Sequence, residues 1–333
     1  MITGTLRIRF TADDLARVRI APGPDPLWEM MMSLFRLREQ GGGSVANWRR
    51  KARRDLAAAG LLTRVRTELM PLAASGAYFP DFLTPLQAQN GLEAGTSMLA
   101  DTPPIRVRRE MDVLRAHTAL PAGLDDLARG EVRAIRRLSR LVDAYCRTTF
   151  SAHRPHIQTA VGHARAGLVR QLSMHGVDDM LARLAPVLLW RPPVLTARYP
   201  AGDREIELRG RGLTLIPSYF CQGTPVALAD DGLPPVLVYP VSRRSLPAPD
   251  DGPLADLLGA TRAAVLSTIA LYPGCTTSEL ARRTPVSLSG ASKHAQVLHR
   301  SGFITSTRQA NLVIHELTAL GAAVLHHHQP DGP

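Results

Sequence analysis

The sequence contains very little lysine. Lys51 and Lys293 are its only lysines among 40 basic residues, and arginine supplies the rest. The net charge of +11 favours polyanionic partners. Because arginine and alanine richness also follows genomic base composition, the charge alone identifies no partner.

Cysteine and long apolar runs are also scarce. Cys146, Cys221 and Cys275 are too few and too scattered for a disulfide framework, which indicates a reducing compartment. No segment approaches about 18 uninterrupted apolar residues, and no apolar stretch of signal-peptide length follows Arg7 and Arg9. We therefore expect a cytoplasmic protein without a membrane partner.

Sequence motifs typical of enzymes are missing. The chain contains no nucleophile elbow, no P-loop, no zinc-protease helix and no dinucleotide fingerprint. The glycine-rich segment 41–44 lacks the following lysine that a phosphate-binding loop needs, so we interpret it as a flexible connection. We predict neither a catalytic residue nor a cofactor, and an enzyme with an unrecognised site in the N-terminal domain is one alternative.

The last quarter of the chain has the order helix, helix, helix, hairpin, helix. Residues 258–271 are predicted to form the first helix, which Pro273 and Gly274 end. Its apolar positions recur at helical spacing and are Leu258, Val265, Leu266 and Ile269. In the second helix, Thr276 and Glu279 have the spacing of a capping box, and the segment 284–286 makes the following turn.

The third predicted helix, residues 287–300, has one apolar and one slim polar face. Ala291, Ala295 and Leu298 are expected to be buried. The residues expected to point outward are Ser289, Gly290, Ser292, Lys293 and Gln296. A helix that enters a major groove needs such a face, because bulky apolar side chains would hold it away from the base edges.

A wing is expected after this helix. Ser301 and Gly302 end the helix, and strand 303–307 then faces strand 312–317 across the basic tip 308–311.

The motifs in this region resemble the DNA-binding domain of ArsR-like transcriptional regulators. They are Thr277-x-Glu279-Leu280-Ala281, Ser287 followed by Ser292-Lys293-His294, and Val297-Leu298-x-x-Ser301-Gly302-Phe303. The resemblance implies a winged helix-turn-helix that binds double-stranded DNA. Gly290, Ala291 and Ala295 are smaller than the residues usual in relatives, so the recognition helix is expected to be thinly packed.

The opening of the chain has an alternating strand at 6–10, a capped segment from Thr11, a proline-rich turn at 22–26 and an apolar helix from Trp28. This opening resembles the large N-terminal domain of unknown function that precedes an ArsR-like winged helix in some actinobacterial-type regulators.

The local charge supports DNA as the partner. Between residues 258 and 325, six basic residues stand against Glu279 and Glu316, a surplus of four. The residues predicted to contact DNA are Ser287, Ser289, Gly290, Ser292, Lys293, Gln296, Arg300 and Arg308. A winged helix used only for protein contacts is a further alternative.

The expected fold is mainly α with a small antiparallel β insert and a C-terminal winged helix-turn-helix. The predicted parts are a helical N-terminal domain 1–192, a β-sheet segment 193–241, a linker 242–253, the winged helix 254–325 and a disordered tail 326–333. Helices are expected at 28–38, 47–59, 81–89, 106–117, 124–148, 156–174 and 177–188. The basic run 48–54 is interpreted as a solvated helix face, with an auxiliary phosphate contact as the alternative.

Three further expectations concern partners. A homodimer is expected, with residues 317–325 and the first helix of the winged helix as its surface. No metal site is predicted, because Cys275 has no cysteine at ligand spacing. The terminal histidine run 326–328, with His294 or His299 across a dimer, is the alternative, but such a run is more often solvent-exposed sequence without a site. A small-molecule effector in the N-terminal domain is expected from its aromatic and methionine residues, most of which we interpret as core: Trp28, Met31, Met32, Phe35, Tyr78, Phe79 and Phe82.

Overall fold

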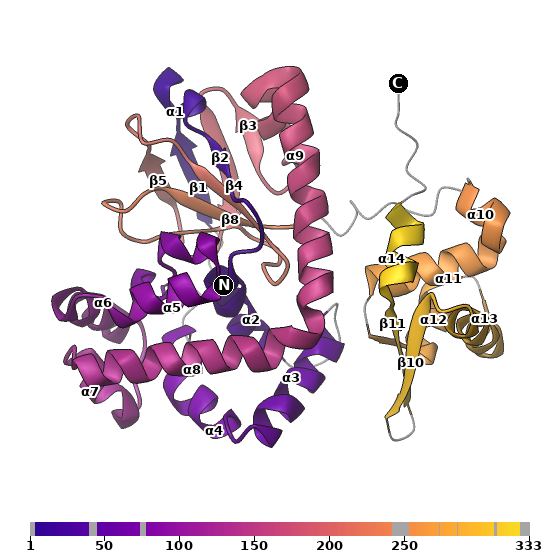
Figure 1. Ribbon diagram of the computed structural model, residues 1–333. Helices are drawn as coiled ribbons and strands as arrows, with labels where there is room; N and C mark the ends of the chain where they lie inside the picture. The colour runs from indigo at the N-terminus through magenta and orange to yellow at the C-terminus, as the bar shows by residue number, and fades with distance from the viewer. Residues whose placement is uncertain are drawn as a thin grey trace. The chain divides into compact units, whose positions relative to one another are not determined.

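The chain folds into two compact units. The N-terminal unit comprises Met1–Gly41 and Arg49–Val241, and the C-terminal unit comprises Gly42–Trp48 and Ser242–Pro333. The computed structural model, shown in Figure 1, describes residues 4–39, 45–73, 78–241, 253–272, 274–284, 286–309 and 312–326. Helices predominate, several small sheets accompany them, and the C-terminal unit contains a winged helix-turn-helix, so the predicted fold class is confirmed. The predicted linker except its last residue, the glycine-rich segment 41–44 and most of the predicted tail lie outside the described residues.

The helices of the N-terminal part are α1 Ala12–Ala16, α2 Pro26–Arg38, α3 Ala46–Ala58, α4 Leu62–Arg64, α5 Leu92–Ala100, α6 Pro104–His117, α7 Asp125–Ala128, α8 Val132–Phe150 and α9 Arg154–Ala182. Short helical turns accompany them: η1 Val65–Leu69, η2 Met70–Ala73, η3 Asp81–Leu83, η4 Leu86–Asn90, η5 Ala122–Leu124 and η6 Ser151–His153. The strands are β1 Gly4–Arg9, β2 Arg19–Ile20, β3 Leu189–Arg191, β4 Val194–Tyr199, β5 Arg204–Glu207, β6 Thr214–Ser218, β7 Val226–Ala227 and β8 Val236–Pro240.

Most predicted helices are present, with changed boundaries, but the predicted helix 124–148 is divided into α7 and α8 at Gly130 (φ +73°). The predicted helices 156–174 and 177–188 form one element, α9, which is kinked at Gly176 (φ +83°), a conformation that favours glycine. The predicted helix 81–89 is wrong: η3 and η4 replace it, because Pro85 stands between them and cannot continue a helical ladder.

Helix α5 was not predicted, and Gly95 explains how it packs. A Cβ atom at Gly95 would lie 2.8 Å from the Cβ of Ala88 and 2.9 Å from Cδ1 of Leu27. The glycine therefore lets α5 lie close to both α2 and η4, a tertiary requirement that leaves no local pattern in the sequence.

Helix α2 is buried on nearly every side. Trp28, Met30, Met31 and Leu34 are all almost completely inaccessible, as expected for a helix that is apolar all round. Its N-cap, Asp25, accepts the backbone N–H groups of the first turn.

Two four-stranded sheets complete the N-terminal unit. Their strand orders are β3-β4-β1-β5 and β2-β6-β8-β7. In β1, Leu6 and Ile8 are buried while Arg7 and Arg9 face solvent. One apolar core joins both sheets to α9, which runs beside them (Figure 1).

The predicted antiparallel sheet in residues 193–241 is wrong in its pairing. The strands of this segment are divided between two mixed sheets that also contain β1 and β2. β6 pairs in parallel with both β2 and β8. Alternation identifies a strand from its own residues but not its partner, so a pairing with the distant chain start left no local signal.

A buried carboxylate fastens α2 to the end of β6. Glu29 accepts the backbone N–H groups of Tyr219 and Phe220 at 2.7 and 3.0 Å and the hydroxyl of Ser218 at 2.9 Å. Burial raises the pKa of Glu29 to about 7.

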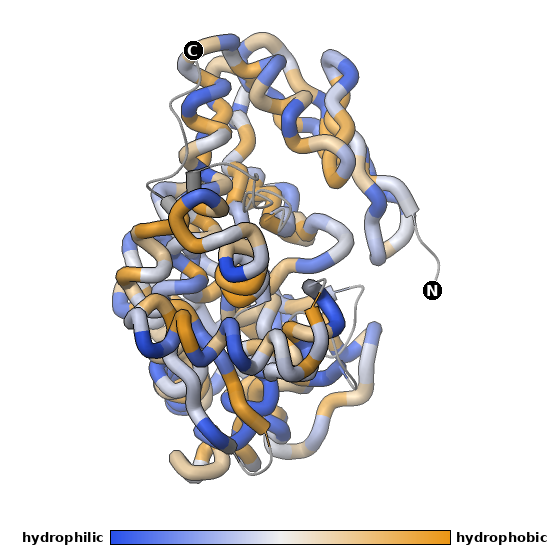
Figure 2. The backbone as a smooth tube through the Cα atoms, turned by 90° about the vertical axis from the view of Figure 1, so that its right-hand side faces the viewer, coloured by the Kyte–Doolittle hydropathy of each residue, from blue (hydrophilic) through white to orange (hydrophobic). Residues whose placement is uncertain are grey.

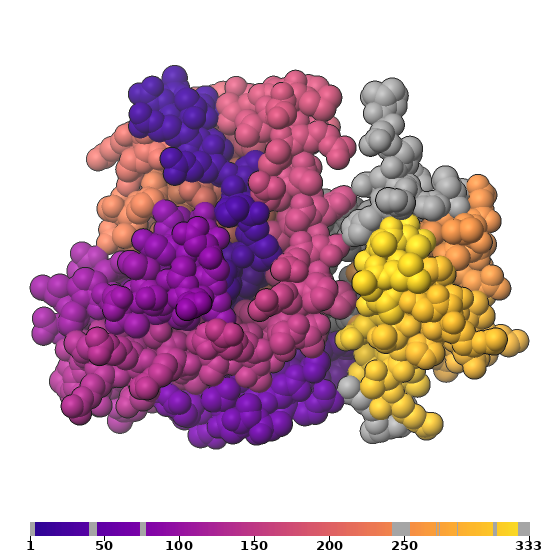
Figure 3. Space-filling model, viewed as in Figure 1, coloured from indigo at the N-terminus to yellow at the C-terminus, as the bar shows by residue number. Residues whose placement is uncertain are grey.

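The C-terminal unit contains α10 Pro253–Leu258, α11 Ala260–Leu271, β9 Cys275–Thr276, α12 Thr277–Arg283, α13 Leu288–Arg300, β10 Ile304–Gln309, β11 Leu312–Leu317 and α14 Ala319–His326. The predicted stripe is confirmed for Val265, Leu266 and Ile269, which are buried on α11. The predicted helix start is wrong, because Gly259 (φ +79°) separates α11 from α10, and Leu258 packs against this core from the end of α10. α14 lies on the outside of this unit in the view of Figure 3.

No helix in the described part of the chain is long and apolar enough to cross a membrane. Figure 2 shows hydrophilic and hydrophobic segments intermixed along the backbone.

Candidate nucleic-acid interface

The second helix of the motif, α12, begins with the predicted capping box. The Thr276 hydroxyl accepts the backbone N–H of Glu279 at 3.3 Å, and the Glu279 carboxylate accepts the backbone N–H of Thr276 at 2.8 Å. These bonds satisfy donors at the helix start that have no partner inside the helix. The direction in which α12 leaves the preceding strand is thereby fixed.

The recognition helix, α13, is fastened at its start and along its inner face. Its N-cap is Ser287, whose hydroxyl accepts the backbone N–H of Gly290 at 3.2 Å. Ala291, Ala295 and Leu298 are buried as predicted and belong to the same apolar core as residues of α11. Ser301 caps the other end.

The outer face of α13 carries the predicted polar side chains. Ser289, Ser292, Lys293, Gln296 and Arg300 are exposed, and the structure therefore places them on one helix surface. Gly290 is half-buried, and a Cβ there would lie 3.3 Å from the Ser287 hydroxyl oxygen. Two exposed apolar residues, Leu288 and Val297, also lie on this helix and were not singled out from the sequence.

The basic side chains predicted to contact DNA are unpaired. Lys293, Arg300 and Arg308 form no ion pair with any other residue that the structure describes. Arg283, in contrast, lies over the ring of Tyr272, with Cζ 4.4 Å from the ring centroid. Lys293 and Arg300 on α13 and Arg308 on the wing therefore leave positive charge available to a phosphate backbone.

The wing differs from its prediction in the length of its strands. β10 reaches Gln309, which pairs with Leu312, and Arg308 pairs with Val313. Arg308 therefore belongs to a strand, and the predicted four-residue tip is wrong. The residues between the strands, 310–311, lie outside the described residues. The register adds a third strand that was not predicted, because Cys275 of β9 pairs with His315.

His315 is a buried residue that the sequence interpretation missed. Its Nε2 lies 2.9 Å from the Thr277 hydroxyl oxygen, and its Nδ1 lies 2.8 Å from the Ser306 hydroxyl oxygen. The side chain is 3% exposed, and burial lowers its pKa to about 4. A neutral imidazole therefore joins both wing strands to α12. The only sequence signal is its place in an alternating strand, which does not reveal these partners.

The described residues show no cluster for a metal ion. No group of three or more histidine, cysteine, aspartate or glutamate side chains lies close enough together within that part of the chain. Cys275 is buried, and burial raises the pKa of its thiol to about 12, which disfavours the thiolate that a metal would need.

The basic run 48–54 is tied to α2 through two of its arginines. Arg49 donates to the Arg36 carbonyl at 3.3 Å, and Arg53 donates to the Leu37 carbonyl at 2.6 Å. Because cations near the end of a helix stabilise it, these two residues support the last turn of α2. Trp48 and Arg49 are buried, so the predicted solvated face is wrong for part of the run.

Comparison with known proteins identifies the C-terminal domain. Residues 256–311 match the MarR family. No curated protein and no solved structure matches the chain. The protein therefore carries a MarR-family winged helix-turn-helix domain after a larger N-terminal domain, and such a domain suggests a DNA-binding transcriptional regulator.

Proposed function

We propose that this protein is a sequence-specific, DNA-binding transcriptional repressor that works in the cytoplasm as a homodimer. The observation that carries the proposal is the division of α13 into two faces. Ala291, Ala295 and Leu298 hold one face in the core, and the other presents short hydrogen-bonding side chains and unpaired cations. A helix built in this way enters a major groove without steric obstruction.

The outer residues of α13 divide by chemistry into two roles. Ser289, Ser292 and Gln296 carry hydrogen-bonding groups suited to base edges, and a glutamine amide pairs well with adenine. Gly290 lets the DNA approach the backbone of the helix closely. Lys293 lies among these residues and is assigned a phosphate contact.

The remaining predicted residues flank that surface. Ser287 at the helix start, Arg300 at its end and Arg308 on the wing strand are assigned to phosphates, so that the wing lies on the backbone or in the minor groove. The narrower ArsR-like assignment stays a prediction, since the matched family is MarR.

Exposed leucines support the proposed dimer. Leu257 of α10 is 63% exposed and Leu320 of α14 is 53% exposed, and both helices pack against α11. A large exposed apolar side chain is stabilised when a second copy covers it. A two-fold dimer would present two recognition helices to half-sites about one helical turn apart.

The N-terminal unit is proposed to receive a small-molecule effector. An effector controls DNA affinity when it binds one arrangement of the two recognition helices better than another. A repressor regulated in this way would release its operator when the effector binds.

The experiment that tests the proposal is selection of genomic fragments on the purified full-length protein, followed by gel shift of the best fragment. We expect an inverted repeat to be enriched and bound tightly, and Gln296→Ala to weaken the complex. Enrichment of no common sequence, with binding that disappears as salt is raised, would contradict sequence-specific recognition.

Leu288 and Val297 favour one second function, a winged-helix module that binds proteins. Both apolar side chains are exposed, and they flank the polar face of α13 on opposite sides, because nine residues correspond to about two and a half helical turns. If the domain binds proteins, Leu288→Ser should abolish binding of the protein partner. If it is a DNA-binding regulator, DNA binding should depend on Lys293.

A further inference from the structure

The N-terminal unit contains a cavity of about 390 Å³ that no comparison assigns. It lies beside the last turns of α2, residues 78–81 and the segments around β4, β5 and β7. All of its lining residues belong to the N-terminal unit and lie outside the segment that matches the MarR family. Cavities of roughly 300–1,000 Å³ hold small organic ligands.

The walls of the cavity are rich in rings. Phe35, Tyr78, Phe79 and Tyr199 line it together with Met32. Four of the residues singled out from the sequence for an effector are therefore at the cavity, although Met32 and Phe79 are also largely buried. In contrast, Trp28, Met31 and Phe82 do not line it. Such walls favour a flat apolar molecule, because aromatic and thioether groups pack well against rings.

One arginine in the lining is incompletely satisfied. The Arg36 Nη1 atom donates to Glu39 at 2.5 Å and to the Gln222 side-chain oxygen at 3.2 Å. Its Nε atom is buried and has no hydrogen-bond partner among the described residues. Glu39 also lies 3.6 Å from the Arg49 guanidinium, so one carboxylate serves two cations.

The lining also contains Arg204, which pairs with Asp231 at 2.9 Å. Asp203, another lining residue, accepts the backbone N–H of Thr5 at 2.8 Å. Among the described residues, Arg36 is therefore the lining cation with a free donor for an anionic group.

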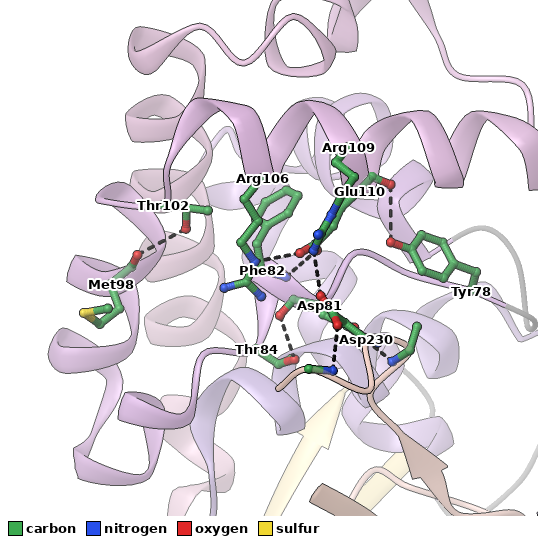
Figure 4. A network of polar contacts seen from close by, with 12 residues as sticks. Tyr78, Asp81, Phe82, Thr84, Met98, Thr102, Arg106, Arg109, Glu110 and Asp230 are labelled. Carbon is green, nitrogen blue, oxygen red and sulfur yellow. Dashed lines mark hydrogen bonds and ion pairs between the residues drawn. The ribbon is translucent and has the colours of Figure 1, made fainter. Parts of the chain in front are cut away.

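The part of the wall formed by residues 78–81 is held in place by buried carboxylates (Figure 4). Asp81 accepts the backbone N–H groups of Ala229 and Asp230 at 3.0 and 2.7 Å. Glu110 accepts the backbone N–H of Phe82 at 2.8 Å, and Arg109 pairs with Asp230 at 2.6 Å. Because both Asp81 oxygens are engaged, this carboxylate supports the wall and leaves Arg36 as the group that meets an anion. Because this wall is already ordered before a ligand binds, little conformational entropy is lost there on binding.

We propose that this cavity binds a ring-containing organic anion, with its rings against Phe35, Tyr78, Phe79 and Tyr199 and its charged group at Arg36. The regulatory role of the bound molecule rests on the proposed DNA-binding function. Occupancy of the cavity does not, and it is measured without DNA, so the two proposals fail separately.

The test compares two fluorescent probes that share their rings and differ in charge. Anilinonaphthalene sulfonate is an anion, and N-phenylnaphthylamine is its neutral analogue. The full-length protein should bind the sulfonate at one saturable site per chain. Arg36→Met should weaken the sulfonate about tenfold or more while leaving the neutral probe nearly unchanged, since a hydrogen bond to a charged group is lost.

Two further variants localise the site. Val226→Phe places a ring in the cavity and should abolish binding of both probes, because Val226 lines it. Arg38→Met is the matched control, since Arg38 lies on the same helix, is exposed and does not line the cavity. Thermal unfolding of each variant shows that it is folded at the assay temperature.

Equal sulfonate binding by the wild-type protein, Arg36→Met and Val226→Phe would overturn the proposal. Failure of the wild-type protein to bind either probe would overturn it as well. In contrast, loss of DNA binding with intact probe binding would count against the regulator alone.

Discussion

The Thr277 hydroxyl oxygen lies 2.9 Å from Nε2 of His315, so a side-chain hydrogen bond joins the wing to the helix that precedes the recognition helix. The other ring nitrogen is engaged by Ser306 of the neighbouring strand. The wing is thus positioned relative to the helix-turn-helix by a polar contact inside the domain. In the proposed complex this contact sets where Arg308 meets the backbone of DNA.

His315 makes the stability of the winged helix depend on pH. Its folded-state pKa of about 4 lies below the ordinary 6.5, so its stabilising contribution is complete above pH 6.5 and is lost as the pH falls towards 4. We expect the melting temperature of the wild-type protein to fall between pH 7 and pH 5 by more than that of His315→Gln, which cannot titrate. Calorimetry of the full-length protein measures this difference, and equal pH slopes would count against it.

Gln296 is expected to read a base. Gln296→Ala should reduce discrimination at one operator position by about 1–3 kcal/mol, because a bidentate pair with a base edge is lost. Arg300→Ala serves as the control and should weaken operator and unrelated DNA alike. Competition gel shifts with singly substituted operators measure both effects. If Gln296→Ala instead lost the same affinity for the operator, its variants and unrelated DNA, Gln296 would contact the DNA backbone and not a base.

Leu320 is expected to lie in the dimer interface. Leu320→Glu should convert the dimer to a monomer, because it puts a charge into a surface that the partner desolvates. The control is Leu172→Glu, which changes an exposed leucine of α9 in the N-terminal unit. Sedimentation velocity of both variants provides the measurement. A Leu320→Glu protein that is still dimeric would remove α14 from the interface.

Glu29 produces the opposite pH dependence in the N-terminal unit. Its folded-state pKa of about 7 exceeds the ordinary 4.5, so its contribution is complete below pH 4.5 and is lost as the pH rises through 7. Burial gives Asp25 and Asp81 shifts of the same sign, with pKa values of about 7 and 6.

We therefore expect denaturant unfolding of the wild-type N-terminal unit to require less denaturant at pH 8 than at pH 5. Glu29→Gln should reduce the change of the denaturant midpoint with pH. The amide NH₂ of the glutamine opposes a backbone donor, so the variant is also less stable at every pH. Identical slopes for the variant and the wild-type protein would show that Glu29 does not titrate in this range.

Features that depend on neighbouring residues could be predicted from the sequence. The Thr276 and Glu279 capping box and the buried face of α13 follow from spacings of three and four residues, which the backbone of a helix fixes. The winged helix-turn-helix is dense in such features, so its order of elements and its outer residues were recognisable.

Features assembled from distant segments could not be predicted. Glu29 meets Ser218, and the cavity brings Phe35 together with Tyr199, through contacts that span long stretches of chain. His315 is similar, since its partners lie on another strand and another helix. Alternation marks Tyr199 and His315 as strand residues, but it does not show what they meet, and no local pattern marks Glu29 as buried.

The most direct test of the account is the salt dependence of operator binding by Lys293→Ala. The only other lysine, Lys51, provides the matched control, since it lies on α3 and pairs with Asp55 at 2.8 Å. We predict that Lys293→Ala weakens binding and lowers the slope of log affinity against log salt by about one, while Lys51→Ala changes neither. An unchanged affinity and slope for Lys293→Ala would contradict the central claim that the outer face of α13 binds DNA.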